Sequence, residues 1–412
     1  MCAICASPLL ACPARLARQA LAKRESTMPE LSSRERVVTA LEHREPDRVP
    51  FDCTFSYGAY LRLKEYLRYE TREVVRPGGP FLNVRPPVEF MKLLNVDLFY
   101  IGLGRGEHTP VFDYGVDTFT DEWGVTFRKI ENPSGVNYEF ASHPLCDATV
   151  RDLADYPWPE PGDPARVRGL EEKCRDLYEN TSFALVGKFS DSIFEQAFML
   201  RGLDQWFRDL ASDPDFACAL MDKLTDLAIR QVEIGLRACG KYIQILRLAG
   251  DDMGHQRGTL LSPRMFRKLI KPRFARLYRA AKDMARQYNP SCKLMAHTDG
   301  DVYPLMPDYI EMGLDVLNPV QPFVAEMEHE KLKAEFGDRL SFHAGIDIQH
   351  VMPFGTPAEV RSEAIRAIRA LGASGGYILA PTHYLQPDVP PENIIALRDA
   401  VLEFGCYPLT TA

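Results

Sequence analysis

The sequence has no surplus of positive charge, no long apolar run and no dense set of cysteines. Lysine and arginine number 49 against 57 aspartate and glutamate, which gives a net charge of −8. Without a basic surplus the chain is poorly suited to bind nucleic acid or an anionic membrane. No apolar run approaches the roughly 20 residues that span a bilayer. The 10 cysteines are too scattered for a disulfide framework and are typical of buried thiols in a reducing compartment. We therefore expect a cytoplasmic protein with no nucleic-acid or membrane partner.

Motifs of several common enzyme folds are also missing. No Gly-x-Gly-x-x-Gly or Walker-type loop follows any apolar run, and there is no nucleophile elbow or kinase signature. The first residues do not fit a cleaved signal, because their apolar stretch precedes their basic stretch. A helix opening follows at Ser32–Glu35. We predict that residues 1–27 form a disordered extension and that residues 28–412 form a single domain.

What the chain does have is a regular alternation of apolar runs and helix-like stretches. Two runs precede residue 105, at about 48–53 and 96–102, and six follow it: Phe183–Gly187, Ile243–Leu246, Leu294–Ala296, Val316–Leu317, Leu340–Phe342 and Tyr377–Ala380. Strands that alternate with helices predict a parallel sheet, and eight of them predict an α/β fold of the (β/α)8 TIM-barrel type. A doubly wound open sheet is the alternative, and the absence of a glycine-rich phosphate loop disfavours it.

Residues 105–150 do not follow this alternation of apolar runs and helix-like stretches. Trp123–Phe127 and Val136–Phe140 are short alternating runs separated by the turn-forming sequence Asn132–Gly135. This pattern predicts a β-hairpin insertion after the second strand of the barrel.

Polar residues follow the apolar runs, and the carboxyl ends of barrel strands meet at one face. His297 and Asp299 are two positions apart, so they point to the same side of their strand. Imidazole and carboxylate are both zinc ligands, and His383 after the last strand would complete a metal site with an open position. Alternatively, His297 is a hydrogen-bonding pocket residue and Asp299 caps the following helix. An iron-binding facial triad has the same residue types, but the helix-rich alternation disfavours that interpretation.

Other strand-end residues are candidates for catalysis or substrate binding. His383 titrates near neutrality and is a candidate proton donor as well as a metal ligand. Of the adjacent carboxylates, we assign Asp252 to catalysis and Asp251 to substrate binding, although one of such a pair often caps a turn. The remaining substrate-binding candidates are Asn318, Gln321, Asp347, Tyr57 and Phe55, with Lys188 and Gln349 as weaker ones and His343 as a core histidine.

Taken together, these motifs resemble the uroporphyrinogen decarboxylase superfamily. The matching segments are Arg36–Leu41 with Asp47–Pro50, Gly250–Asp252, His297–Gly300, Gly313–Asn318, Ala344–Asp347, Gly375–Ile378 and His383–Asp388 with Pro391–Asn393. The resemblance covers roughly residues 30–408 and implies a (β/α)8 barrel.

The superfamily has two chemical branches, and the resemblance to each implies a different function. True decarboxylases act on a tetrapyrrole without metal and carry an Arg-Gln-Ala-Gly-Arg-Tyr segment after the first strand. Here that segment reads Phe51–Gly58 and contains no arginine, although His383 matches the decarboxylase histidine. The methyltransferase branch holds zinc with a His-x-Cys pair and a later Cys. In this chain His297 matches that histidine, whereas Asp299 and His383 stand in the cysteine positions.

The resemblance is closer to the methyltransferase branch. It implies a zinc-dependent methyltransferase that moves a methyl group between a small methylated substrate and a corrinoid protein or a thiol, and it allows a homodimer. The alternatives are a cofactor-free uroporphyrinogen decarboxylase, with His383 as proton donor and Asp252 holding the substrate, and a barrel that binds a tetrapyrrole or corrinoid without turnover.

Overall fold

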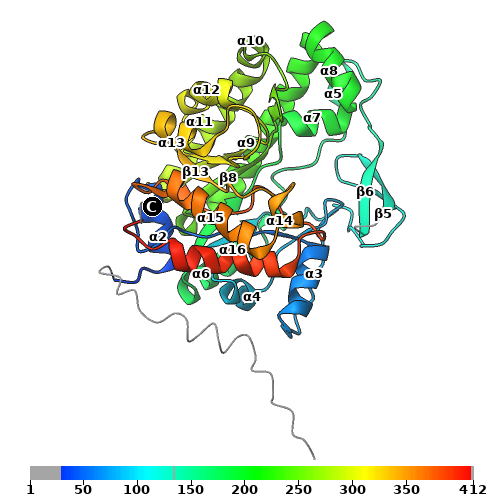
Figure 1. The fold of residues 1–412 in the computed structure, drawn as a ribbon. Helices are drawn as coiled ribbons and strands as arrows, with labels where there is room; N and C mark the ends of the chain where they lie inside the picture. The colour runs from blue at the N-terminus through cyan, green and yellow to red at the C-terminus, as the bar shows by residue number, and fades with distance from the viewer. Residues whose placement is uncertain (1–28, 133–134, 410–412) are drawn as a thin grey trace, which may run out of the picture.

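Seven parallel strands form the centre of the molecule. The computed structural model describes residues 29–132 and 135–409. Within these ranges the sheet has the order β14-β13-β12-β11-β8-β7-β3, and every neighbouring pair is parallel. Its strands are β3 (Leu98–Gly102), β7 (Ala184–Lys188), β8 (Ile245–Gly250), β11 (Lys293–His297), β12 (Val316–Asn318), β13 (Ser341–His343) and β14 (Tyr377–Ile378). Helices surround the sheet (Figure 1), so the predicted α/β TIM-barrel class is confirmed.

The first predicted strand, at about 48–53, forms only isolated bridges instead of a regular strand. It nevertheless lies between the two edges of the sheet. The Leu379 amide donates to the Pro50 carbonyl and the Asp52 amide to the Leu379 carbonyl, both at 2.9 Å, while the Asp97 amide before β3 donates to the Phe51 carbonyl at 2.7 Å. Pro50 has no amide hydrogen to extend the ladder. The segment therefore closes the barrel with few backbone hydrogen bonds.

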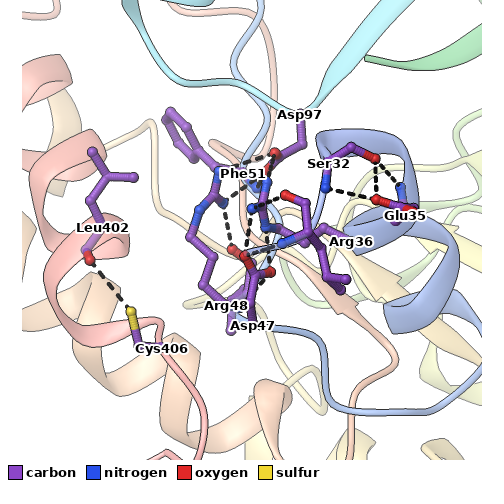
Figure 2. Close-up of polar contacts among 11 residues, drawn as sticks. Ser32, Glu35, Arg36, Asp47, Arg48, Phe51, Asp97, Leu402 and Cys406 are labelled. Carbon is purple, nitrogen blue, oxygen red and sulfur yellow. Dashed lines mark hydrogen bonds and ion pairs between the residues drawn. The ribbon is translucent and has the colours of Figure 1, made fainter. Parts of the chain in front are cut away.

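A buried charged cluster secures this closure (Figure 2). The Asp97 carboxylate accepts from the Phe51 amide at 2.8 Å and from the guanidinium groups of Arg36 and Arg48, each at 2.7 Å. Arg36 also pairs with Asp47, and its own helix α2 (Ser33–Leu41) begins with the expected capping box at Ser32. Arg36 is therefore held where it can reach both aspartates.

The insertion after β3 is an antiparallel sheet that lies to one side of the barrel (Figure 1). The predicted hairpin is present as β5 (Thr126–Asn132) and β6 (Gly135–Ser142). A further strand, β4 (Thr118–Thr120), pairs with β5, so the sheet has three strands instead of two. Trp123 and Phe127 are buried in the main core, which attaches the insertion to the barrel.

Helices alternate with the strands as expected, and one helical segment is irregular. Thr356 starts α15 with a capping box, and Ser262 caps the helical segment that contains Pro272. This segment is irregular: a π-turn at Phe266–Ile270 lies just before Pro272, whose ring disfavours a regular α-helical turn. No helix among the described residues has the length and apolar character needed to cross a membrane. The predicted extension at residues 1–27 lies outside the described residues.

The bounds of the remaining elements complete the fold. The α-helices are α3 (Tyr57–Tyr66), α4 (Val88–Leu93), α5 (Asp152–Asp155), α6 (Leu170–Asn180), α7 (Phe194–Arg201), α8 (Leu203–Ser212), α9 (Pro214–Cys239), α10 (Pro263–Met265), α11 (Lys271–Tyr288), α12 (Met306–Glu311), α13 (His329–Phe336), α14 (Val351–Phe354), α15 (Pro357–Gly372) and α16 (Pro391–Phe404). The short strands β1 (Phe55–Ser56) and β2 (Asn83–Val84) pair with each other, as do β9 (Gly254–His255) and β10 (Gly258–Thr259).

Candidate functional site

The interior of the barrel changes from apolar to polar along the strands. Leu98, Val186, Ile245, Met295 and Val316 are fully buried and pack together as an apolar layer. Two residues further along the same five strands are Tyr100, Lys188, Arg247, His297 and Asn318. Because side chains in a strand repeat with a period of two, these polar residues form the next layer on the same inner face. The site is therefore a polar layer on an apolar floor, at the carboxyl ends of the strands.

The three predicted metal ligands come together in this layer. One ligand atom each from His297, Asp299 and His383 lies within 4.8 Å of the others. The rings of His297 and His383 are 5.8 Å apart, and the His297 Nε2 is 3.7 Å from the Asp299 Oδ2. Residues separated by more than eighty positions in the sequence thus converge on a single point.

Hydrogen bonds fix which nitrogen of His297 is free. The Asn318 Oδ1 accepts from Arg247 at 3.3 Å, which orients the Asn318 amide, and it lies 2.7 Å from the His297 Nδ1. The His297 Nδ1 must therefore donate, and its Nε2 keeps a lone pair directed at Asp299. The Asn318 Nδ2 donates to the His343 Nδ1 at 2.7 Å, and the His343 Nε2 in turn donates to the Asp52 carboxylate at 3.0 Å. His343 is thus a hydrogen-bonded core histidine, as expected.

Three carboxyl groups surround the same point. Asp252 lies 3.8 Å from the His297 Nε2 and accepts the Asp299 amide at 2.8 Å, while Glu195 on α7 accepts the Asp252 amide at 3.3 Å. Burial, together with the neighbouring carboxylates, raises the pKa of Glu195 to about 9 and that of Asp299 to about 7. Burial likewise raises the pKa of Asp252. The environment therefore favours neutral over charged carboxyl groups at this point, and a bound cation would offset that preference.

Two predicted substrate-binding carboxylates have structural contacts instead. Asp251 accepts the amides of Ile193, Phe194 and Glu195 at 3.0, 2.5 and 3.0 Å, so it caps the start of α7. Asp347 is 2% exposed and accepts the backbone amides of residues 349–351, so it caps α14 in the same way. Short carboxylates commonly satisfy the free amides of a helix start. Neither of the two aspartates lines a cavity of the site.

The three other predicted contacts differ in position. Phe55, a substrate-binding candidate in the sequence, is fully buried and packs on Phe90, so it belongs to the core. Tyr57 packs against Tyr114 of the insertion. Gln321 accepts the Gly300 amide at 2.8 Å and thereby supports the loop that contains Asp299. Of the predicted substrate-binding residues, Asn318 and the weaker candidate Lys188 lie within the polar layer.

Two connected cavities open at this layer. His297, Asn318 and His383 line an inner cavity of about 30 Å³, which is large enough for an ion or a water molecule. An outer cavity of about 820 Å³ lies beside it, and Thr54, Tyr100 and Tyr384 line both. A cavity of that size suits a small organic molecule.

A family model described as uroporphyrinogen decarboxylase (URO-D) matches residues 109–404, which is most of the chain. The chain belongs to the URO-D family. Two curated relatives are named uroporphyrinogen decarboxylase. The protein from Anaeromyxobacter sp. (strain Fw109-5) is 25% identical over 288 residues, covering 68% of this chain and 75% of the relative. The protein from Geobacter sulfurreducens is 23% identical over 280 residues, covering 65% and 75%.

The fold of this URO-D family member is shared with a solved structure described as a methyltransferase from Methanosarcina mazei. The two superimpose with a TM-score of 0.61 at 18% identity, covering 91% of this chain and 99% of the other. At this level of identity the likeness concerns the fold alone, and it agrees with the barrel derived from the strand order.

Several site residues of this family member were missed in the sequence. Arg247 was recognisable as a charged residue within the apolar strand Ile245–Gly250. Glu195 gave no such indication, because acidic residues are common in the first turn of a helix and usually face solvent there. Arg85 lies in a loop with no motif, yet it lines the outer cavity. Only the folded arrangement brings these residues to the strand ends.

Proposed function

We propose that this URO-D family member is a metal-dependent methyltransferase, with zinc held by His297, Asp299 and His383. In this proposal a methyl group moves between a small methylated substrate and a corrinoid protein or a thiol. The observation that supports it best is the convergence of the three ligand atoms within 4.8 Å beside the inner cavity.

The donor set suits a divalent cation. Two imidazoles and one carboxylate are zinc ligands, and three protein ligands leave the fourth position open for substrate. The His297 Nδ1 is engaged by Asn318, which is the type of outer contact that orients a metal-binding imidazole. Burial, aided by Arg247 and Lys188, lowers the pKa of His383 to about 4, so its ring is neutral at pH 7 and has a lone pair to share.

The acidic residues around the site support a cation for a separate reason. Burial raises the pKa of Glu195, Asp252 and Asp299, and the neighbouring carboxylates raise that of Glu195 and Asp299 further. A bound divalent cation would stabilise their charged forms and would release protons on binding. We therefore expect metal affinity to increase with pH across the neutral range.

Each residue of the site has a role in this proposal. When bound, zinc would lower the pKa of a thiol or polarise an oxygen that leaves the methyl group. Asp252 holds the Asp299 amide and so positions that carboxylate. Tyr100 and Tyr384 stand at the junction of the two cavities, where they would orient the substrate and exclude water from the inner one.

Uroporphyrinogen decarboxylation is the second candidate, and the names of the two curated relatives favour it. That reaction assigns His383 the role of proton donor. A pKa of about 4 disfavours this role, since nearly all His383 side chains would lack the proton at neutral pH. Binding of a tetrapyrrole or corrinoid without turnover is the third candidate.

Metal analysis of the purified full chain tests the first step of the proposal. We expect about one zinc per chain, loss of the metal in His297→Ala and in His383→Ala, and normal content in the control His108→Ala, an exposed histidine on a surface loop. Circular dichroism should show that all variants are folded. A metal-free wild-type chain that cannot be loaded with zinc would contradict the proposal.

A second assay separates the candidate reactions. The chain is incubated with 4-methoxybenzoate, labelled in its methyl group, and with chemically reduced cobalamin as a surrogate acceptor. Formation of labelled methylcobalamin supports methyl transfer, whereas carbon dioxide release from uroporphyrinogen supports decarboxylation. Binding of cobalamin with neither product, unchanged in His383→Ala, supports the non-catalytic candidate.

A further inference from the structure

The outer cavity is lined by more positively than negatively charged side chains among the described residues. Arg76, Arg85, Arg105 and Lys188 line it, whereas Glu73 is the acidic residue among its lining residues. Within residues 29–132 and 135–409, none of the four cations makes a hydrogen bond or an ion pair. Four cations and one carboxylate give the cavity a positively charged lining, which suits a ligand of opposite charge.

Two of the cations lie next to each other at the ends of neighbouring strands. The Arg85 guanidinium packs over the backbone of Gly102 at the end of β3, so closely that a β-carbon on Gly102 would lie 2.5 Å from its Nη2. Lys188 ends the neighbouring strand β7. Arg85 is exposed and Lys188 is partly exposed, so a ligand in the cavity can reach both side chains. Burial and the charges of Arg247 and Arg85 lower the pKa of Lys188, and an anion between the two cations would offset their repulsion.

The rest of the cavity wall is largely apolar. Val84, Met91, Phe99, Leu103 and Phe112 line it, which suits a hydrocarbon or aromatic body. Tyr100 and Tyr384 connect it to the inner cavity beside His297 and His383. A ligand that fills the outer cavity with its charged group on Arg85 and Lys188 can therefore extend toward the candidate metal site.

We propose that Arg85 and Lys188 form an anion subsite that binds the carboxylate of a small organic acid with an apolar body. The identification of this acid as the methyl-bearing substrate rests on the proposed function. The anion subsite itself does not, because none of its residues belongs to the candidate metal site. The planar Arg85 guanidinium can bind a carboxylate with two parallel hydrogen bonds, and Lys188 supplies a second positive charge beside it.

Calorimetric titration of the full chain tests the subsite with three related probes: 4-methoxybenzoate, its neutral amide 4-methoxybenzamide, and 4-methoxyphenyl phosphate. We expect the benzoate to bind at least tenfold more tightly than the amide, since a hydrogen bond to a charged group contributes about 1.5–3 kcal/mol. Equal affinity for the acid and the amide would overturn the proposal. Tighter binding of the phosphate would overturn the assignment to a carboxylate.

Substitutions of Arg85 and Lys188 test whether these two residues bind the carboxylate. Arg85→Gln and Lys188→Gln should each weaken benzoate binding about tenfold and leave amide binding nearly unchanged. Arg72→Gln is the matched control, because Arg72 is an exposed arginine close in the sequence that does not line the cavity. Unchanged benzoate affinity in both folded lining variants would contradict the subsite.

One further measurement separates this proposal from the methyltransferase proposal. His383→Ala should lose the metal yet keep its preference for the benzoate over the amide. Charge-selective binding without metal or methyl transfer would leave the subsite standing and contradict only the proposed function. Methyl transfer without charge selectivity would contradict only the subsite.

Discussion

Asp97→Asn tests whether the charged cluster holds the barrel closed. The wild-type carboxylate is fully buried and neutralises Arg36 and Arg48, whose guanidinium nitrogens are both 2.7 Å away. Asparagine has the same shape but no charge, and its NH2 group would face other donors. Removing one partner of a buried ion pair typically costs about 3–5 kcal/mol, because the remaining charge stays buried without compensation.

That cost predicts a measurable fall in the unfolding temperature. Unfolding entropy is about 2.1 cal/mol/K per residue, or roughly 0.9 kcal/mol/K for a chain of this size, so we expect a decrease of about 3–6 °C. Lys92→Ala is the control for surface charge, because its pair with Glu89 is exposed and is expected to contribute at most about 0.5 kcal/mol. A Tm of Asp97→Asn within about 1 °C of the wild type would refute the reasoning.

The same substitution should also affect zinc binding at the candidate metal site. Asp97 holds Phe51, and the next residue, Asp52, accepts from His343 at 3.0 Å. His343 is linked through Asn318 to His297. Asp97→Asn should therefore weaken zinc binding in a chelator competition. The control Asp209→Asn breaks a comparably buried pair with Arg201 outside this network and should leave zinc binding unchanged.

Three further substitutions test single features. Asn318→Ala should lower zinc affinity about 10–100-fold in a chelator competition, because it releases the Nδ1 of His297. Gly250→Ala should also weaken zinc binding in a folded chain, because its β-carbon would lie 2.8 Å from the His297 ring; unchanged affinity would contradict this close packing. Burial lowers the pKa of His329 to about 3. The unfolded chain then binds more protons below pH 6.5, so stability decreases as the pH falls, and His329→Leu should remove a loss of about 2 kcal/mol between pH 6.5 and 5 in denaturant titrations.

The order of elements was predictable because its determinants are local. Apolar runs with turn residues between them gave the barrel strands β3, β7, β8 and β11–β14, and the Asn132–Gly135 turn gave the hairpin. The first strand was predicted as regular, but its amide at Phe51 binds a carboxylate 46 residues away. When a side-chain carboxylate takes the place of a backbone carbonyl as the acceptor for a strand amide, no periodic pattern in the sequence indicates it.

The site was predictable only in part, because similar residues at strand ends have different tertiary partners. Asp251 and Asp252 are adjacent residues of the same type, yet the first caps α7 and the second lies beside His297. The direction of each side chain decides between these roles. The period of two along β11 did place His297 two residues after the buried Met295, on the same face, whereas Asp299 lies beyond the end of that strand.

Two groups of charged side chains lie at the mouth of the barrel, and together they link the two proposals. Glu195, Asp252 and Asp299 lie close to the two neutral histidines, and burial raises the pKa of each carboxyl group. Lys188 and Arg85 line the adjoining outer cavity. In the described residues neither Lys188 nor Arg85 forms an ion pair with any of the three acids. A cation at the carboxyl groups and an anion at Arg85 and Lys188 would stabilise both groups of charges. The arrangement therefore fits a site for two ligands of opposite charge better than an internal salt-bridge network.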